Sequence, residues 1–406
     1  MSIPLSLPHI SEREVELVNH VLRSGRLSIG PFVEEFEKRF ADYVGRKFAI
    51  AVNSGTSALH LCVRALGIGP KDEVLTTPFT FVASANCLLY EGAMPSFVDI
   101  DPATLNIDPL AIQHAIERDY MIDKVRRRLV NRLNGRTLKA ILPVHVFGLP
   151  CDMRAILGIA KEWGLYVIED ACEALGAEIR GTRAGAFSHA AAFGFYPNKQ
   201  MTTGEGGMIV TDDAAIAEYC RAARNQGREG SETWLRHSLV GFNYRLSELH
   251  CALGVAQLER IDDLLAARAS VAEYYAESLA DVPQIGLPWD PTDTIRSWFA
   301  YVIQMKGPAG PTLRDRLIAG LKERDIACQT YFPCVHLQPY LEKMRLLPKR
   351  PLSVAESASE RCLALPFFPS MTEEQVEEVC TAVREVLSRM PASARQRQLI
   401  GARGAA

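Results

Sequence analysis

The stretch AAAFGFYPNKQMTTGEGG, residues 190–207, decides the fold of this chain. It reads as a short apolar strand, a Pro-Asn turn that presents Lys199, and a glycine-rich loop that leads into a second strand, GGMIVTD, over residues 206–212. A single lysine on a tight turn suits a nucleophile that forms a Schiff base, because the glycines behind it let the backbone approach a ligand closely. The same residues also fit an exposed lysine on a hairpin-like turn. The rest of the chain has to separate these two interpretations.

From residue 48 onward, short apolar runs alternate with helical segments. FAIAV, EVLTT, PSFVDI, KAILPVHVF and GLYVIED are such runs. This alternation predicts an α/β domain in which a mainly parallel sheet carries helices on both faces. The loops NSGT, TPFTF, EDACE and YPNKQ all follow strand ends, where such sheets bind ligands. We therefore expect one site at that rim of the sheet.

The length of 406 residues favours two or three domains. We expect residues 1–30 to form an N-terminal helix and a loop, residues 31–260 a large α/β domain, and residues 261–390 a smaller α+β domain joined by a long helix. Residues 391–406 have little to bury and are expected to be disordered. A basic segment, residues 118–139, interrupts the pattern. We interpret it as an extra amphipathic helix with a solvated face; a patch for a phosphorylated ligand or partner is the alternative.

The composition is that of an ordinary soluble protein, with 48% hydrophobic and 23% charged residues. A net charge of -3 argues against nucleic-acid or membrane-surface binding. We expect no membrane helix and no secretory signal, because no apolar run is long enough and the N-terminus has no basic start. Ten cysteines without a CxxC pair favour reduced, buried thiols in the cytoplasm over disulfides or a metal site.

Three loops carry the residue types of a cofactor site. The small residues of NSGTS, residues 53–57, precede a helix and leave backbone N–H groups for an anion such as phosphate, although plain helix caps look alike. Asp170 ends a buried strand and needs a partner: either a protonated ring nitrogen or the following helix. Phe81 could stack on a flat ring or belong to the core. Arg245 could pair with a carboxylate or phosphate, or simply begin a helix.

A phosphate cradle, an aromatic lid, an acid for a ring nitrogen and a lysine together suggest pyridoxal phosphate (PLP). With these residues in view, the chain resembles the DegT–DnrJ aminotransferases, fold-type I enzymes that aminate keto sugars carried on nucleotides. The resemblance spans about residues 7–389. It rests on the order of these motifs: GPFVEEFE, NSGTSALH, TPFTFVASAN, VDIDPATLNID, PVHVFGLPCDM, VIEDACEALGA, FYPNKQMTTGEGG, GFNYRLSELHCALGVAQLERID and PCVHLQPY.

The resemblance implies a role for each matching residue. Lys199 would form the internal aldimine and move the proton, and its presence argues against the dehydratase branch of the family. Asp170 would pair with the pyridine nitrogen. The other cofactor contacts that it implies are Phe81 on the ring, Gly55, Thr56 and Ser57 around the phosphate, Glu173 near the ring hydroxyl, and Asn243 on the phosphate of the neighbouring subunit in a homodimer.

Two positions depart from the resemblance. Glu173 stands where many relatives have Gln or His, and we expect it to be neutral or turned away from the ring hydroxyl. Gly194 stands where many have Ser, a loss that Tyr196, Asn198 or Ser57 could offset. Substrate contacts are expected from Tyr331 and His336, from Arg245, and from the loop of residues 25–30 that includes Gly30. A satisfied core histidine is the alternative for His336.

These observations predict a PLP-dependent transaminase. It would move an amino group from glutamate or glutamine to a nucleotide-linked keto sugar in amino-sugar or polysaccharide biosynthesis, as a cytoplasmic homodimer with shared sites. One alternative within the same fold is an aminotransferase for a keto-cyclitol or another carbocycle. The alternative from another class is a PLP-binding regulator or partner without turnover.

Overall fold

The apolar runs of the sequence form the central sheet of the computed structural model, which describes residues 2–125, 128–228, 236–308, 310–344 and 350–389. The strand order is β1-β11-β10-β7-β6-β2-β3; β11 alone runs against its neighbours on this path. The predicted mainly parallel sheet is confirmed. Its strands are β1 (Phe48–Val52), β2 (Asp72–Thr76), β3 (Met94–Phe97), β6 (Thr137–Leu142), β7 (Tyr166–Asp170), β10 (Ala190–Gly194) and β11 (Gly207–Thr211).

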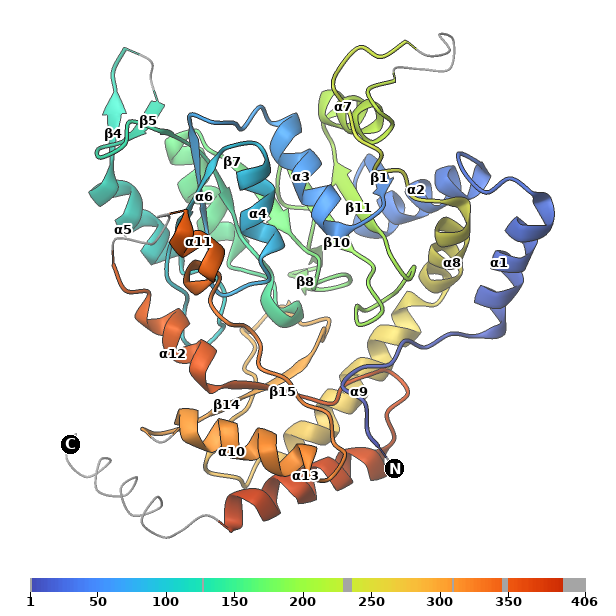
Figure 1. Cartoon of the computed structure of the whole chain (residues 1–406), viewed down its shortest axis with the longest axis vertical. Coiled ribbons are helices and arrows are strands. Elements are labelled where there is room, and N and C mark those ends of the chain that lie inside the picture. Colours follow the sequence, from blue (N-terminus) through green and yellow to red (C-terminus); the bar gives the residue numbers. More distant parts are fainter. Residues whose placement is uncertain (1, 126–127, 229–235, 309, 345–349, 390–406) are drawn as a thin grey trace.

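Helices cover both faces of this sheet, as predicted (Figure 1). Alternate strand residues point to opposite faces: Ile50 packs in the cluster of one face and Ala51 in that of the other. One face carries α3 (Gly55–Ala65), α4 (Ala83–Tyr90) and α7 (Ala214–Arg224). The other carries α2 (Pro31–Val44), α8 (Glu248–Glu259), α5 (Pro109–Asp119) and α6 (Met153–Trp163).

The N-terminal helix α1 (Glu12–Ser24) packs against α8. The side chain of Ser11 and that of Glu14 form the predicted capping box. Glu14 is buried and also accepts a hydrogen bond from the Gln257 amide at 2.7 Å. This contact fixes the start of α1 on the large domain.

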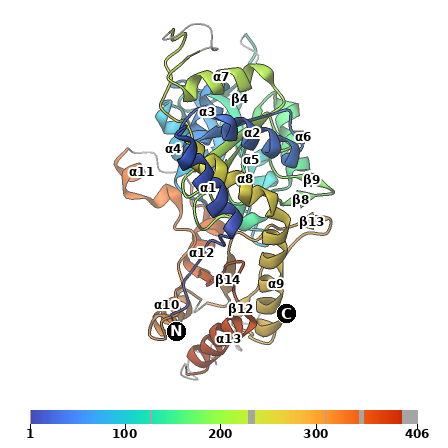
Figure 2. The same cartoon turned by 90° about the vertical axis from the view of Figure 1, so that its right-hand side faces the viewer.

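A second core belongs to the smaller domain, at the foot of the molecule in Figures 1 and 2. The long helix predicted before it is broken at Arg260, and α9 (Ile261–Leu279) continues into the smaller domain. Its sheet contains β12 (Ile285–Gly286), β14 (Tyr301–Met305) and β15 (Cys362–Leu365), covered by α10 (Gly310–Lys322) and α13 (Glu373–Ser388). The remaining short elements are β8 (Glu178–Ile179), β9 (Thr182–Arg183), β13 (Thr294–Ile295), α11 (Pro339–Lys343) and α12 (Ser353–Arg361). The tail expected to be disordered lies outside the described residues.

The helix predicted for the basic segment is wrong. Residues 118–139 form an antiparallel hairpin, β4 (Tyr120–Asp123) and β5 (Arg128–Asn131), which joins the main sheet through β6 (Figure 1). Two of its side chains are anchored on a buried carboxylate: Glu73 accepts from the Tyr120 hydroxyl at 2.6 Å and from Asn131 at 2.9 Å. Tyr120, Leu129 and Asn131 lie on one buried face of the hairpin. The many basic residues hide this period-2 pattern.

Within the described ranges, no helix is both long and apolar enough to cross a membrane. No cluster of three or more His, Cys, Asp or Glu in those ranges has the arrangement of a metal site. All ten cysteines are free thiols; nine are buried and Cys172 is half-buried.

Candidate active site

Lys199 lies on the turn that follows β10, as predicted. Its backbone N–H donates to the Tyr196 carbonyl at 2.9 Å. The side chain is only 16% exposed, and its Nζ lies 3.5 Å from Oε1 of Glu173 and 4.0 Å from the ring centre of Phe299. The amine therefore projects into the molecule, which removes the surface-lysine interpretation.

A buried arginine supports this turn from behind. Arg268 of α9 donates to the Lys199 carbonyl at 2.8 Å and to the carbonyls of Trp298 and Phe299 at 3.2 and 3.4 Å. Its side chain is 2% exposed, and burial lowers the pKa of Arg268 to about 10. One guanidinium thus fixes both the lysine turn and the aromatic residue beside the amine.

Asp170 ends β7 with a buried carboxylate. Its Oδ2 accepts from the Ser84 hydroxyl at 2.7 Å, and its Oδ1 accepts from the Cys172 N–H at 3.2 Å. A carboxylate has about four acceptor positions, so these two bonds leave capacity for another donor.

Asp170 and Lys199 act on the same small neighbourhood. Burial raises the pKa of the Cys172 thiol; the charge of Asp170 raises it further and that of Lys199 opposes this. Both charges also act on the Glu173 carboxyl. Cys172 donates its N–H to Asp170 at 3.2 Å, and the next residue, Glu173, lies 3.5 Å from the Lys199 amine, so the lysine and the aspartate face the same short segment of the chain.

Glu173 lies between these two groups. Burial raises the pKa of Glu173 above its ordinary value, and the nearby Lys199 only partly offsets this. Its Oε2 accepts from the Phe147 N–H at 3.0 Å, which orients the carboxyl toward the lysine. Its raised pKa agrees with the neutral form that the sequence suggested as one option, and its orientation relative to a ring hydroxyl stays a prediction.

The NSGTS loop forms the start of α3. Ser54 caps the helix by accepting from the Ser57 N–H at 3.1 Å, and the Ser57 hydroxyl donates to Asn53 at 2.7 Å. These bonds hold the loop, so the Ser57 hydroxyl is already engaged. The N–H groups of Gly55 and Thr56 have no acceptor within the helix, and the helix dipole favours an anion there.

Glycines bring three backbone segments together at this point. A Cβ at Gly55 would lie 2.9 Å from Sγ of Cys172 and 3.1 Å from Cα of Gly194. A Cβ at Gly207 would lie 2.4 Å from the Ser54 carbonyl oxygen. Loops after β1, β7 and β10 therefore meet at one rim, as predicted.

Two predicted aromatic contacts are placed near the cleft. Phe81 is 61% exposed and lies three residues before Ser84, the partner of Asp170, so its ring is not part of the core. Tyr331 stacks on Phe147 and Phe299, with ring planes within 19° and 9° of parallel. Tyr331 thus belongs to the aromatic wall beside the lysine.

The GFNYR segment runs beside the NSGTS loop of the same chain. The Asn243 carbonyl accepts from the Asn53 amide at 3.4 Å, while the Asn243 residue is exposed. Arg245 donates to the side chains of Asn225 and Gln226 at 3.0 and 2.8 Å. Its contacts in the described structure are therefore with its own chain.

Two expected substrate contacts have other partners. A Cβ at Gly30 would lie 2.4 Å from Oε2 of Glu248, whose carboxylate accepts from the N–H groups of Phe32 and Val33 at 3.1 and 2.9 Å. Gly30 thus makes room for a carboxylate that caps α2. His336 is 1% exposed, and its Nε2 lies 3.1 Å from Glu356. Its Nδ1 is buried without a hydrogen-bond partner among the described residues, so the histidine lies in the core but only one of its two ring nitrogens is satisfied.

Sequence reasoning gave no role to Arg268, Phe299, Phe147 or Ser84. Ser84 and Phe147 carried a weak signal, since they lie in the quoted motifs TPFTFVASAN and PVHVFGLPCDM. The others come from distant parts of the chain, and only the folded structure brings them to Lys199.

The site can hold a phosphorylated aromatic aldehyde. Gly55 and Thr56 offer N–H groups to a phosphate, Asp170 has free acceptor capacity for a ring N–H, and Lys199 supplies an amine. Oδ1 of Asn198 is a buried acceptor without a hydrogen-bond partner among the described residues. Such an atom is usually satisfied by a ligand or water.

Comparison with known proteins identifies the family. Residues 8–384 match the DegT/DnrJ/EryC1/StrS aminotransferase family. The chain belongs to this family. The resemblance, the fold type and the aminotransferase class inferred from the sequence are confirmed.

The spore coat polysaccharide biosynthesis protein SpsC of Bacillus subtilis (strain 168) is 38% identical over 396 residues, covering 95% of this chain and 97% of SpsC. The GDP-perosamine synthase of Caulobacter vibrioides is 38% identical over 387 residues, with 95% and 98% covered. Among solved structures, S. venezuelae DesV in complex with a ketimine intermediate superposes with a TM-score of 0.84 at 35% identity, covering 96% of this chain and 100% of DesV.

Proposed function

We propose that this aminotransferase uses PLP to move an amino group from glutamate or glutamine to a nucleotide-linked keto sugar, in amino-sugar or polysaccharide biosynthesis. The proposal is supported by the short distances that link the Lys199 amine, the Asp170 carboxylate and the Gly55 backbone through Glu173 and Cys172. The names of two relatives, a GDP-perosamine synthase and a polysaccharide biosynthesis protein, support the substrate class.

When bound, PLP supplies an electron sink that lets an amino group and a proton be exchanged between two substrates. Gly55 and Thr56 would hold its phosphate with backbone N–H groups at the start of α3. Asp170 would accept a hydrogen bond from its ring nitrogen and keep that nitrogen protonated. Phe81 would cover one face of the ring.

Lys199 is the group that holds and moves the proton at its Nζ. Arg268 fixes the backbone carbonyl of this lysine, and Phe299 lies against the amine, so the side chain has one favoured position. Glu173, 3.5 Å away, can take a proton from the amine or return it because burial raises its pKa toward neutrality. The stacked wall that includes Tyr331 limits access of water to this point.

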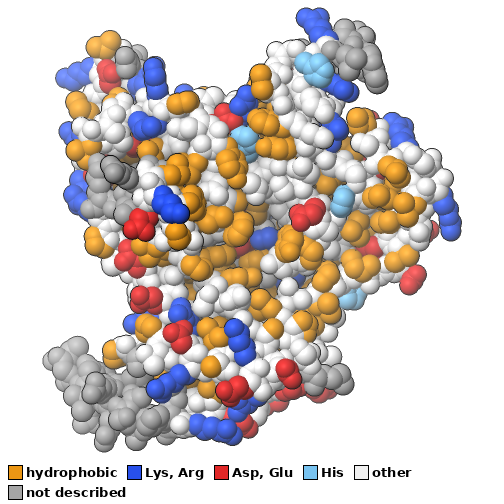
Figure 3. All heavy atoms as spheres, in the orientation of Figure 1, with side chains coloured by type: hydrophobic (Ala, Val, Ile, Leu, Met, Phe, Trp, Pro, Cys, Tyr) orange, Lys and Arg blue, Asp and Glu red, His pale blue; other side chains and the backbone are white. Residues whose placement is uncertain are grey.

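We further propose a cytoplasmic homodimer. Ten free thiols support a reducing compartment. Figure 3 shows apolar side chains gathered across the middle of one face, and the exposed large apolar residues include Phe81, Tyr90 and Tyr196. In a dimer closed over this face, the exposed Asn243 would reach the partner's phosphate. Light scattering of the purified protein tests the dimer, and Asn243→Ala should weaken PLP retention without breaking it.

The function is tested with Lys199→Ala. The wild-type protein with PLP should show a visible absorbance band that glutamate or glutamine bleaches, and a GDP-linked keto sugar should then be aminated. Lys199→Ala should lower turnover by about 10³-fold or more. Lys161→Ala, an exposed lysine of α6, is the matched control and should keep full activity.

Three outcomes would contradict the proposal in different ways. Turnover of keto-cyclitols but not of nucleotide-linked sugars would assign the alternative substrate. PLP binding with no bleaching of the visible band by any amino donor would favour the alternative of a PLP-binding regulator without turnover. A protein that stays colourless with added PLP would exclude PLP as its cofactor.

A further inference from the structure

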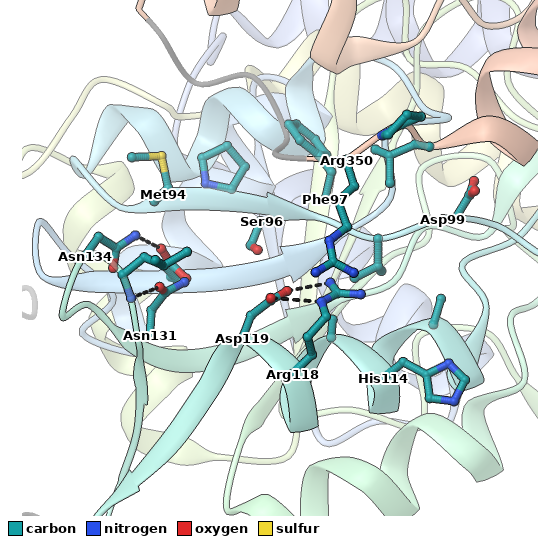
Figure 4. A pocket seen from close by; sticks show the side chains of 18 residues that line it. Met94, Ser96, Phe97, Asp99, His114, Arg118, Asp119, Asn131, Asn134 and Arg350 are labelled. Atoms are coloured by element: carbon teal, nitrogen blue, oxygen red, sulfur yellow. Dashed lines mark hydrogen bonds and ion pairs between the residues drawn. The ribbon is translucent and has the colours of Figure 1, made fainter.

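A cavity of about 660 Å³ lies at the edge of the main sheet (Figure 4), and its lining includes none of the groups described around Lys199. Its walls are the edge strand β3, helix α5, the turn after β5 with Leu133 and Asn134, and the segment of Arg350 to Leu352 that precedes α12. None of the residues that contact Lys199, Asp170 or Glu173 lines it. The unassigned basic segment of the sequence forms one side of this cavity.

The acidic groups that line the cavity are already hydrogen-bonded. Glu73 accepts from Tyr120 and from two asparagine amides, and Asp99 accepts from the N–H groups of Val354 and Ala355 at 3.1 and 2.8 Å. Asp119 forms a two-bond ion pair with Arg118, at 2.9 and 2.5 Å. All three carboxylates thus have hydrogen-bond partners, but only Asp119 is paired with a cation; Glu73 and Asp99 accept from neutral donors and keep their negative charge.

The basic groups are not matched in the same way. Arg350 has no hydrogen bond or ion pair with any described residue, and neither has His114 of α5. In Figure 4 the side chains of Arg350 and Arg118 extend from opposite walls toward the same part of the cavity. Arg118 is paired with Asp119, and Arg350 has no ion-pair partner among the described residues. The excess of positive charge is local to these two side chains, because the charged carboxylates of Glu73 and Asp99 also line the cavity. Guanidinium pairs of this kind favour phosphate, which accepts two parallel hydrogen bonds.

The shape favours a small molecule over a peptide strand. The Val98 N–H donates to the Thr76 carbonyl at 3.0 Å, so alternate residues of β3 face β2 and Pro95 faces the free edge. Proline has no N–H, and it blocks the addition of another strand. The volume is in the range of metabolite sites, and Met94, Phe97 and Leu352 give it an apolar part.

We propose that this cavity binds a phosphorylated metabolite of nucleotide size, with the phosphate between Arg118 and Arg350 and an aromatic or aliphatic part against Phe97. The site spans the sheet domain and the segment leading to α12, whose N-terminus Asp99 already caps. Occupation would tie α12 more firmly to the sheet. The inference does not depend on the identity of the keto sugar.

Calorimetric titration of the full chain with AMP, UMP, orthophosphate and adenosine tests the proposal. We expect a nucleotide monophosphate to bind, adenosine not to bind, and Arg350→Ala and Arg118→Ala each to weaken binding about 10-fold. Arg132→Ala is the matched control, because Arg132 is exposed on the same basic segment and does not line the cavity. Hydrogen exchange should show protection in α5 and at residues 350–355.

Equal nucleotide binding by the wild type, Arg350→Ala, Arg118→Ala and Arg132→Ala would overturn the proposal, because the nucleotide would then occupy another site, such as the one near Lys199. Absence of binding to the wild type at about 10 mM of every probe would overturn it as well. Neither readout uses turnover, so a failure here is distinguishable from a failure of the proposed aminotransferase reaction.

Discussion

Two neighbouring carboxylates at the end of β7 face different regions of the molecule. Glu169 is fully buried and accepts from the N–H groups of Gly185, Phe187 and Ser188 and from the Ser188 hydroxyl, all within 3.0 Å. His145 Nε2 adds a fifth contact at 3.0 Å. Asp170, one residue later, accepts two hydrogen bonds from described residues.

The difference in hydrogen bonding separates Glu169, which stabilises the fold, from Asp170, which we propose as a ligand-binding group. Successive side chains of a strand point to opposite faces of the sheet. Glu169 therefore points at the loop that contains Gly185, Phe187 and Ser188, which fills its acceptor positions, and Asp170 points toward the rim where loops meet. Burial alone does not distinguish them, because both are buried. We propose that this unfilled capacity makes Asp170, and not Glu169, the carboxylate that binds the cofactor.

The largest expected effect is on Asp170→Asn. The amide is isosteric, and the Ser84 hydroxyl can accept from it as readily as it donates to the carboxylate, so the unfolding free energy should change by less than about 1 kcal/mol. Without the negative charge the cofactor nitrogen loses its proton, and turnover should fall about 10³-fold or more. Steady-state kinetics and denaturant unfolding check this. If the variant kept its activity, Asp170 would not have the role of partner to the cofactor nitrogen.

Glu169→Gln should give the opposite result. In either orientation its amide NH₂ faces backbone N–H donors, so we expect a loss of about 3 kcal/mol in unfolding free energy. The folded fraction should retain near-normal kcat. Unfolding of both variants under the same conditions is the comparison; equal stabilities of Glu169→Gln and Asp170→Asn would contradict it.

The pH dependence sharpens the same contrast. Burial by itself raises the pKa of Glu169, but hydrogen bonds from His145 and the backbone outweigh it and hold that pKa below its ordinary value. A lowered pKa gives stabilisation that is present above the unfolded value of about 4.3 and is lost as pH falls through the folded value. The stability gap between wild type and Glu169→Gln should therefore be largest above about pH 5 and shrink below pH 4.

Lys199 and Arg268 form a second pair of this kind, one in the site and one behind it. Arg268→Met should cost about 1–3 kcal/mol in stability because three carbonyls lose their donor. Turnover should fall about 10-fold, since both Lys199 and Phe299 lose their anchor. Arg268→Lys restores the charge and one or two bonds, and it should recover part of kcat. The pH dependence of the visible absorbance band of the PLP-loaded protein distinguishes a repositioned Lys199 from a general loss of stability. Only a repositioned lysine should change the pH at which the band titrates.

The sequence predicted the sheet, the rim and the position of Lys199 on its turn, because these depend on local patterns: apolar runs, small residues before a helix, and a lysine on a turn. It could not predict Arg268, which looks like a solvated arginine in LLAARAS until carbonyls from two other segments bury it. It misread the basic hairpin because charge obscured a two-residue alternation. Nothing near Gly30 in sequence indicates its packing against Glu248, more than two hundred residues away, and its contact with substrate stays a prediction.

The smallest expected effect concerns Gly194 and Gly55, which lie close together at the NSGTS loop. A Cβ at Gly194 would lie 3.6 Å from Cβ and Sγ of Cys172 and 3.7 Å from Cα of Gly55, which are ordinary contacts, whereas the same atom at Gly55 has contacts of 2.9 and 3.1 Å. Gly194→Ser should therefore fold normally and add a hydroxyl beside the Gly55 N–H, with a gain of about 1 kcal/mol, or about 5-fold, in PLP affinity. Gly55→Ser should lose PLP binding.

Absorbance titration of the cofactor-free proteins with PLP measures both glycine variants. Similar affinities for the two would mean that the phosphate does not sit between these loops. A gain confined to Gly194→Ser would show that the cradle has room on the β10 side and none on the α3 side, because at Gly55 the backbone and the thiol already fill the space that a side chain needs.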